Sequence, residues 1–216
     1  MGPMKRRGWW GVGLAALVLA GCGTPAFRVV SNGKEHTYAK VPRDWAVIPI
    51  ETGRVDRLDP AFGEDVELIW SVGLDAAASP DAGHFQQLVN YEPLDEPTGV
   101  LSVYQIQGSY AQKVSLTEAR MVPLAVDPLF VGDEVKDLVE IVDYQPFAPS
   151  DGLQGSRVVF NMRPQPDAPW STYDLVTSFD QSRARMYTLV VGCSGECFKA
   201  NRHTISQLVS SWKVDR

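Results

Sequence analysis

The chain is poor in the residues from which catalytic and metal sites are built. Its 216 residues include three cysteines and three histidines, so few soft metal ligands and few general bases are available. It has no glycine-rich phosphate loop, because Gly11 and Gly13 lie in the apolar run near the N-terminus. His36 and His84 have no recognisable catalytic partner in the sequence. We therefore expect a protein that is not an enzyme and that holds no cofactor.

Two further motifs fail on spacing or composition. Gly192-Cys193-Ser194-Gly195 is mis-spaced for the Gly-x-Ser-x-Gly nucleophile elbow of serine hydrolases. Residues 56–67 have the length of a calcium loop, but oxygen ligands and a glycine are missing where that loop needs them. Those positions hold Leu58, Pro60 and Ala61. Neither serine hydrolysis nor an EF-hand site is predicted.

The N-terminal apolar run is too short to remain as a membrane span. Residues 8–20 carry no charge, but 13 residues give roughly 20 Å of helix, whereas the bilayer core is about 30 Å thick. This length disfavours the alternative of an uncleaved transmembrane helix. Lys5, Arg6 and Arg7 precede the run, and Leu19-Ala20-Gly21-Cys22 ends it. Such a layout is typical of a bacterial secretion signal.

The end of this signal resembles the lipobox of bacterial lipoproteins, Leu-Ala-Gly-Cys. The resemblance implies cleavage just before Cys22 and attachment of a diacylglyceryl group to its sulfur. It predicts a signal peptide over residues 1–21, a lipidated tether over residues 22–33 and a single domain over residues 34–216. The protein would be anchored to a bacterial cell membrane through lipid, facing the extracytoplasmic side.

The charge of the mature chain is acidic. Without Lys5, Arg6 and Arg7, 17 of the 20 basic residues remain against 26 acidic ones, a formal net charge of −9. Anionic lipid and nucleic acid repel such a body. We expect the domain to need no membrane-binding surface beyond its acyl chains, to stand off the membrane on its tether, and to bind no nucleic acid.

Apolar residues alternate along several short segments and predict β-strands. The segment 66–74 is the clearest example, and the almost continuously apolar segment 186–191 predicts a central strand. The other predicted strands span residues 36–41, 45–51, 100–107, 138–144, 157–162 and 173–179.

Two helices are predicted between and after these strands. Ser115 and Glu118 form a capping box at the start of the first, which Pro123 ends or kinks. The second helix closes the chain, with Ser194 as its N-cap and an apolar stripe. Because several strands follow one another without a helix, we expect an α+β fold in which a mostly antiparallel sheet is covered by helices.

Two segments resemble the PsbP-like family. Tyr38-Ala39-Lys40-Val41-Pro42-Arg43-Asp44-Trp45 resembles its opening motif, in which a strand runs into Val-Pro-x-x-Trp. Ile205-Ser206-Gln207-Leu208-Val209-Ser210-Ser211-Trp212-Lys213-Val214 resembles its last helix, which closes with Ser-Phe or Ser-Trp and a basic residue. The resemblance covers residues 36–214.

This resemblance implies an antiparallel sheet sandwiched by helices, an α-β-α sandwich, in a family of mostly non-catalytic binding or assembly proteins. The family includes the extrinsic subunit of photosystem II and many bacterial lipoproteins. The chain departs from the shorter members by an insertion at residues 75–97, which we expect to be a long loop and a place for partner contact.

Cys193 and Cys197 remain as an even pair in an oxidising compartment. They are expected to form a structural disulfide at the junction of a strand and the last helix, where Gly195 allows the tight bend. Two alternatives stay open. A cysteine at a helix N-terminus has a lowered pKa and serves redox sites, and Cys-Ser-x-x-Cys with His203 downstream resembles a copper loop, although few ligands are available.

Two classes of function follow from these patterns. The first is a non-catalytic lipoprotein that binds an envelope protein or a lipidic ligand, or that assists assembly in the cell envelope. The second is a redox- or metal-handling lipoprotein that uses Cys193 and Cys197 with His203.

Overall fold

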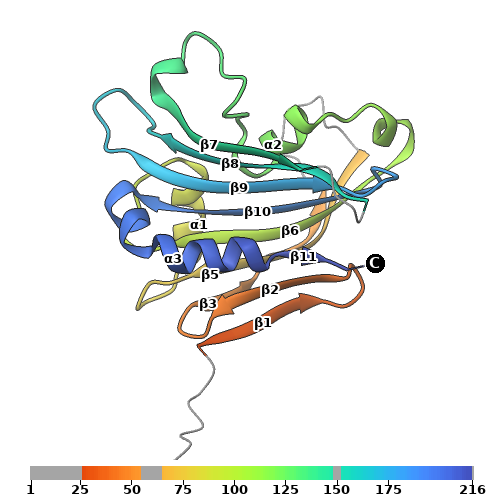
Figure 1. Ribbon diagram of the computed structural model, residues 1–216, viewed down its shortest axis with the longest axis horizontal. Helices are drawn as coiled ribbons and strands as arrows, with labels where there is room; N and C mark the ends of the chain where they lie inside the picture. The colour runs from red at the N-terminus through yellow and green to blue at the C-terminus, as the bar shows by residue number, and fades with distance from the viewer. Residues whose placement is uncertain (1–25, 55–64, 148–151, 216) are drawn as a thin grey trace, which may run out of the picture.

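The computed structural model describes residues 26–54, 65–147 and 152–215 (Figure 1). Cys22 and the predicted secretion signal lie outside these residues. The helices are α1 (Ala82–Val89), α2 (Leu116–Leu124) and α3 (Gly195–Ser211), with short 3-10 turns η2 (Gly108–Gln112) and η3 (Lys136–Leu138). The strands are β1 (Phe27–Asn32), β2 (Thr37–Pro42), β3 (Ala46–Pro49), β4 (Gly53–Arg54), β5 (Val66–Asp75), β6 (Thr98–Ile106), β7 (Val139–Phe147), β8 (Gln154–Met162), β9 (Ser171–Phe179), β10 (Arg185–Ser194) and β11 (Lys213–Val214).

Most strands form one antiparallel sheet in the order β3-β5-β6-β10-β9-β8-β7, with β4 paired to β5. β10 lies at its middle, between β6 and β9. Eight of its residues in succession, 186–193, are buried, as its apolar sequence predicted. The prediction of an α+β fold with a mostly antiparallel sheet is confirmed.

Helices cover both faces of this sheet. Side chains along β9 alternate between the faces, and Tyr173 donates a hydrogen bond to the Leu88 carbonyl of α1 (3.4 Å). Phe179, on that same face, packs in one cluster with Ala119 and Val122 of α2. Asp174 points to the opposite face, where α3 lies. Figure 1 shows α3 crossing in front of the sheet and α1 behind it, which makes an α-β-α sandwich.

A small second sheet, in the order β1-β2-β11, joins the two ends of the domain. β1 occupies residues that were predicted to be tether, so that prediction is wrong for residues 27–32. Val30 packs against the core beneath the sheet, beside buried Ala39 and Val41. Burying this side chain and pairing six residues with β2 lowers the free energy by more than the conformational entropy of a flexible tether would.

The insertion at residues 75–97 is not wholly a loop, as we had expected. Asp81 accepts a hydrogen bond from the Gly83 backbone N–H and caps α1, and Leu88 of this helix is fully buried. Of its four Pro and Gly residues, Gly83 lies in the first turn of α1, while Pro80, Pro93 and Pro97 lie outside the helix. In the sequence these residues concealed a short amphipathic helix with one buried side chain.

The two predicted helix starts are both present. Ser115 and Glu118 form the reciprocal capping box of α2, which ends one residue after Pro123 with Ala125 in the left-handed region. Ser194 caps α3 by accepting from the Cys197 N–H (3.3 Å). Within the ranges described, no helix is long and apolar enough to cross a membrane.

Candidate functional site

The disulfide at the strand–helix corner fixes where α3 leaves the sheet. The sulfur atoms of Cys193 and Cys197 lie 2.08 Å apart, at bonding distance, with their Cα atoms 5.9 Å apart. Their residues are only 1% and 7% exposed. Cys193 is the next-to-last residue of the central strand, and Cys197 lies in the first turn of α3. This covalent link therefore holds the first turn of the helix against the sheet.

The structure does not bring His203 to these sulfurs. His203 is exposed and lies six residues beyond Cys197 on the same helix, which is roughly 9 Å along the axis. Nowhere in the described residues do three or more His, Cys, Asp or Glu side chains come together in a group that could hold a metal ion.

A groove of about 600 Å³ lies between α3 and the sheet face that α3 covers, over strands β7, β8 and β9. We call it the α3 groove. Its volume falls in the range of small-molecule sites. Its lining residues are Val142, Asp143, Gln145, Arg157, Val159, Asn161, Trp170, Thr172, Asp174, Gly195, Phe198, Lys199, Arg202, Ile205 and Ser206.

Each wall of the groove follows from strand and helix periodicity. Val158 and Phe160 of β8 face the core, so the alternating residues Arg157, Val159 and Asn161 face the groove. The helix contributes apolar Phe198 and Ile205 at the base of its wall. The alternation that turns Val158 and Phe160 toward the core thus turns a mixed set of polar and apolar side chains toward the groove.

An ion pair forms part of the groove floor. Arg157 donates from Nε to Asp174 Oδ1 (2.8 Å) and from Nη2 to Asp174 Oδ2 (2.5 Å). The Asp174 side chain is 1% exposed, while that of Arg157 is 26% exposed and reaches toward solvent. Burial raises the pKa of the Asp174 carboxyl above its ordinary value, an effect that Arg157 partly offsets and that the neighbouring Asp143 carboxylate adds to. The hydrogen bond to Asp174 raises the pKa of Arg157.

Polar contacts fix the end of the groove near the disulfide. Thr172 donates to Asn161 Oδ1 (2.8 Å), and Asn161 donates to Glu140 on β7 (2.9 Å). The Arg163 guanidinium lies 4.4 Å from the centre of the Trp170 ring, a cation–π contact that holds this aromatic wall. A rigid end wall of this kind favours binding without rearrangement.

The helix side of the groove carries unpaired positive charge. Lys199 and Arg202 are both exposed on α3, and across the described ranges neither one makes an ion pair. The acidic residue Asp143 lies on the opposite strand wall. The groove therefore has a cationic helix wall, an apolar base and a polar strand wall.

The structure gives His84 a partner that the sequence did not suggest. Its Nδ1 lies 2.8 Å from Oδ2 of Asp75, a fully buried residue at the end of β5. The Asp75 carboxylate also accepts backbone N–H groups of Ala77 and Asp81. This cluster fastens the insertion to the sheet. The nine-residue spacing between Asp75 and His84 is no helix or strand repeat, so periodicity could not reveal it.

Known structures show the same architecture. The chain superposes on the solution structure of cyanobacterial PsbP, CyanoP, from Synechocystis with a TM-score of 0.52 and 10% identity, over 90% of this chain and 96% of that one. The fold is PsbP-like. No known protein-family profile matches the sequence, and no curated protein matches it significantly.

Two more distant structures also overlap with it. LpqN of Mycobacterium tuberculosis, described as involved in cell envelope biogenesis, has a TM-score of 0.46 and 14% identity over 88% of this chain and 91% of that one. The Ran-binding protein Mog1p of Saccharomyces cerevisiae has a TM-score of 0.44 and 7% identity over 87% and 95%. At these levels of similarity they carry no argument about function.

Proposed function

We propose that the chain is a non-catalytic lipoprotein of the bacterial cell envelope, held on the extracytoplasmic side through acylated Cys22, whose α3 groove binds an anionic amphiphile. Residues 1–22 support the anchoring, because a basic head, a short apolar run and Leu-Ala-Gly-Cys follow one another there. The PsbP-like fold supports a binding or assembly role by its resemblance to a mostly non-catalytic family.

One observation carries the assignment of the groove: the two unpaired cations Lys199 and Arg202 stand over an apolar base made by Phe198, Ile205 and Val159. A ligand with an apolar body and a negatively charged end satisfies both features at once. Arginine suits carboxylate and phosphate groups because its guanidinium donates in a planar fork. A lipidic molecule of the envelope has this chemistry.

The floor of the groove is built to hold its shape. Both carboxylate oxygens of Asp174 accept hydrogen bonds from Arg157, and the Asp174 side chain is only 1% exposed, so this carboxylate is shielded from a ligand in the groove and holds Arg157 in place. Within the described residues, neither a histidine nor a cysteine lines the groove. These contacts favour a binding role over a catalytic one.

The redox or metal alternative gains no support from the geometry. The disulfide is buried, whereas reactive cysteines are partly exposed, and His203 lies about two turns further along the helix. We therefore assign Cys193 and Cys197 a structural role.

Photo-crosslinking in cells tests the groove. A photoreactive amino acid at Ser206, which lines the groove, should capture a small lipid-like adduct seen as a discrete mass increase. The same group at His203, exposed on the same helix outside the groove, is the matched control and should capture none.

Charge reversal then tests the cations. Lys199→Glu with Arg202→Glu should abolish the adduct at Ser206, whereas Lys34→Glu, an exposed cation on the β1–β2 turn, should leave it intact. A protein crosslink in place of a lipid adduct, or equal labelling at both positions, would contradict the proposal.

A further inference from the structure

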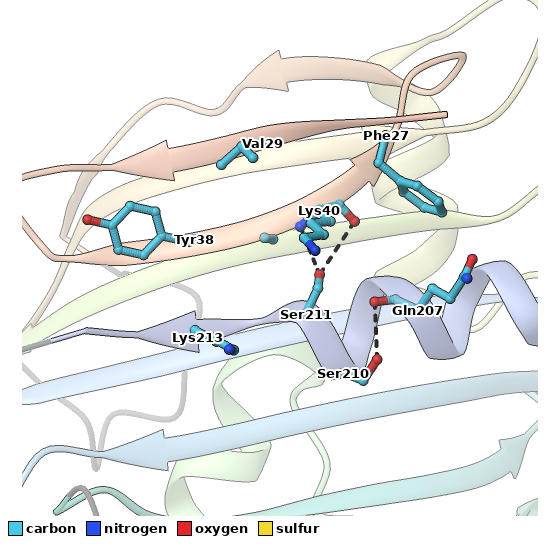
Figure 2. A pocket seen from close by; sticks show the side chains of 9 residues that line it. Phe27, Val29, Tyr38, Lys40, Gln207, Ser210, Ser211 and Lys213 are labelled. Carbon is cyan, nitrogen blue, oxygen red and sulfur yellow. Dashed lines mark hydrogen bonds between the residues drawn. The ribbon is translucent and has the colours of Figure 1, made fainter. Parts of the chain in front are cut away.

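A second groove, of about 610 Å³, lies where the outer face of the small sheet meets the C-terminal end of α3 (Figure 2). We call the surface around it the anchor face. Its lining residues are Phe27, Val29, Tyr38, Ala39, Lys40, Gln207, Ser210, Ser211 and Lys213.

The strand register explains which side chains this face presents. Val29 pairs with Lys40 across β1 and β2, and Lys213 of β11 pairs with Tyr38. Paired residues share a face of the sheet, and the alternate residues of β2, Ala39 and Val41, are buried in the core. Apolar, aromatic and basic side chains are therefore gathered outward.

The anchor face is both apolar and positively charged. Val29 is 65% exposed, and Figure 2 shows Phe27 and Tyr38 on the same two strands on either side of it. Lys40 and Lys213 are exposed and, so far as the chain is described, take part in no ion pair. This combination is typical of surfaces that enter the headgroup region of a bilayer.

Hydrogen bonds through the Ser211 side chain join the two walls of the anchor face. The Lys40 N–H donates to Ser211 Oγ (2.8 Å), and Ser211 in turn donates to the Leu208 carbonyl (2.7 Å). The end of α3 is thus tied to the middle of β2 (Figure 2). A rigid face can present its side chains to a surface without an ordering cost.

The length of chain before β1 decides what covers this face. Phe27 lies five positions after Cys22, and five extended residues reach at most roughly 18 Å. Residues 27–32 form β1, so only the residues before Phe27 can act as a tether. Phe27 lines the groove and therefore stays within this distance of the lipidated Cys22. The acyl chains must lie in the bilayer, so the groove is held beside it.

We propose that the anchor face rests on the bilayer that holds Cys22, with Phe27, Val29 and Tyr38 in the interfacial region and Lys40 and Lys213 on lipid phosphate groups. This inference rests on the acylation proposed above. The mature chain has a net charge of −9, so an anionic membrane repels the rest of the molecule while it attracts these lysines. The charge thereby orients the domain and turns its acidic body away from the lipid.

A depth measurement tests this contact. Val29→Cys carries a nitroxide label in the acylated protein, where Cys22 is modified and Cys193 and Cys197 are bonded, so the label has one site. Tyr144→Cys on β7 is the control, since Tyr144 is 43% exposed and β7 lies at the opposite edge of the molecule (Figure 1). The protein is reconstituted into vesicles of phosphatidylglycerol and phosphatidylcholine in equal parts.

The label at residue 29 should become more accessible to oxygen and less accessible to a water-soluble nickel complex, while the label at residue 144 keeps its aqueous values. Lys40→Glu with Lys213→Glu should return the label at residue 29 toward aqueous values. Protein that bears acyl chains and binds vesicles, yet is equally aqueous at both positions, would overturn this inference alone. Protein that bears no acyl chain would instead overturn the proposed anchoring.

Discussion

At the scale of single residues, two ion pairs differ in how far they are buried. Arg120 donates from Nε and Nη2 to the two Asp127 oxygens, each at 2.8 Å, and these side chains are 4% and 2% exposed. Arg120 also donates to Ser156 of β8, which fastens α2 to the sheet. The pair of Arg157 and Asp174 lines the α3 groove instead.

Removing one partner of the buried Arg120–Asp127 pair should destabilise the fold. Asp127→Ala leaves the Arg120 charge buried and unpaired, so we expect a loss of about 3–5 kcal/mol in the free energy of unfolding, measured by urea denaturation. Asp133→Ala is the control, because its pair with Lys136 is exposed and should contribute at most about 1 kcal/mol. An equal loss of unfolding free energy for the two substitutions would contradict the structural role of the Arg120–Asp127 pair.

The raised pKa of Asp174 makes stability depend on pH. Its folded pKa lies above the ordinary value of 3.8, so the folded state holds this proton more tightly than the unfolded state. The stabilising contribution is complete below pH 3.8 and is lost as the pH rises through the folded pKa.

Asp174→Asn cannot ionise and should not show this loss. The free energy of unfolding of the wild type minus that of Asp174→Asn should therefore fall as the pH rises from below 3.8 through the raised pKa, and then level off. Urea denaturation of both proteins across this pH series measures the difference. A difference that rises with pH would show that the pair with Arg157 lowers the pKa overall.

None of these pairs could be read from the sequence. Arg157 and Asp174 are 17 residues apart on neighbouring strands, and their contact depends on a register that periodicity leaves open. His84 and Asp75 meet across the start of an insertion, at a nine-residue spacing that matches neither helix nor strand periodicity. Sequence patterns indicate which face a residue takes, whereas pairing requires the tertiary arrangement.

At the scale of elements, segments with strong periodicity or caps were predictable. The segment 66–74 became β5, the apolar segment 186–191 lies within β10, and the capping box marks the start of α2. β1 and α1 were missed because neither has a long repeat. β1 depends on pairing with β2, and α1 depends on one buried side chain, Leu88, and one cap.

The disulfide gives a prediction for the β10–α3 corner. Cys193→Ser with Cys197→Ser opens a loop of four residue steps, and the chain-entropy relation gives a loss of about 2 kcal/mol in the free energy of unfolding. Thermal or urea denaturation measures it, with wild type reduced by dithiothreitol as the matched comparison. Photo-crosslinking at Ser206 should persist in the double variant; its complete loss in folded protein would favour a functional role for the sulfurs.

At the scale of the whole molecule, the proposed orientation on the membrane depends on charge and on the length of chain before β1. The sequence led us to expect an acidic domain that stands off the membrane on a tether over residues 22–33. Residues 27–32 form β1 and so cannot belong to such a tether. The register of the small sheet places Lys40 and Lys213 on the same face as Val29 of β1. In the orientation proposed above, the acidic body and the basic anchor face act together to orient the α3 groove.

The most direct test of this account is the intact mass of the protein extracted from the membranes of a bacterial host. We expect a mass that lacks residues 1–21 and includes acyl groups, and Cys22→Ser should abolish both the cleavage and the acylation. A mature mass without acyl groups, or a mass that retains the leader, would contradict the anchoring on which the orientation of the molecule depends.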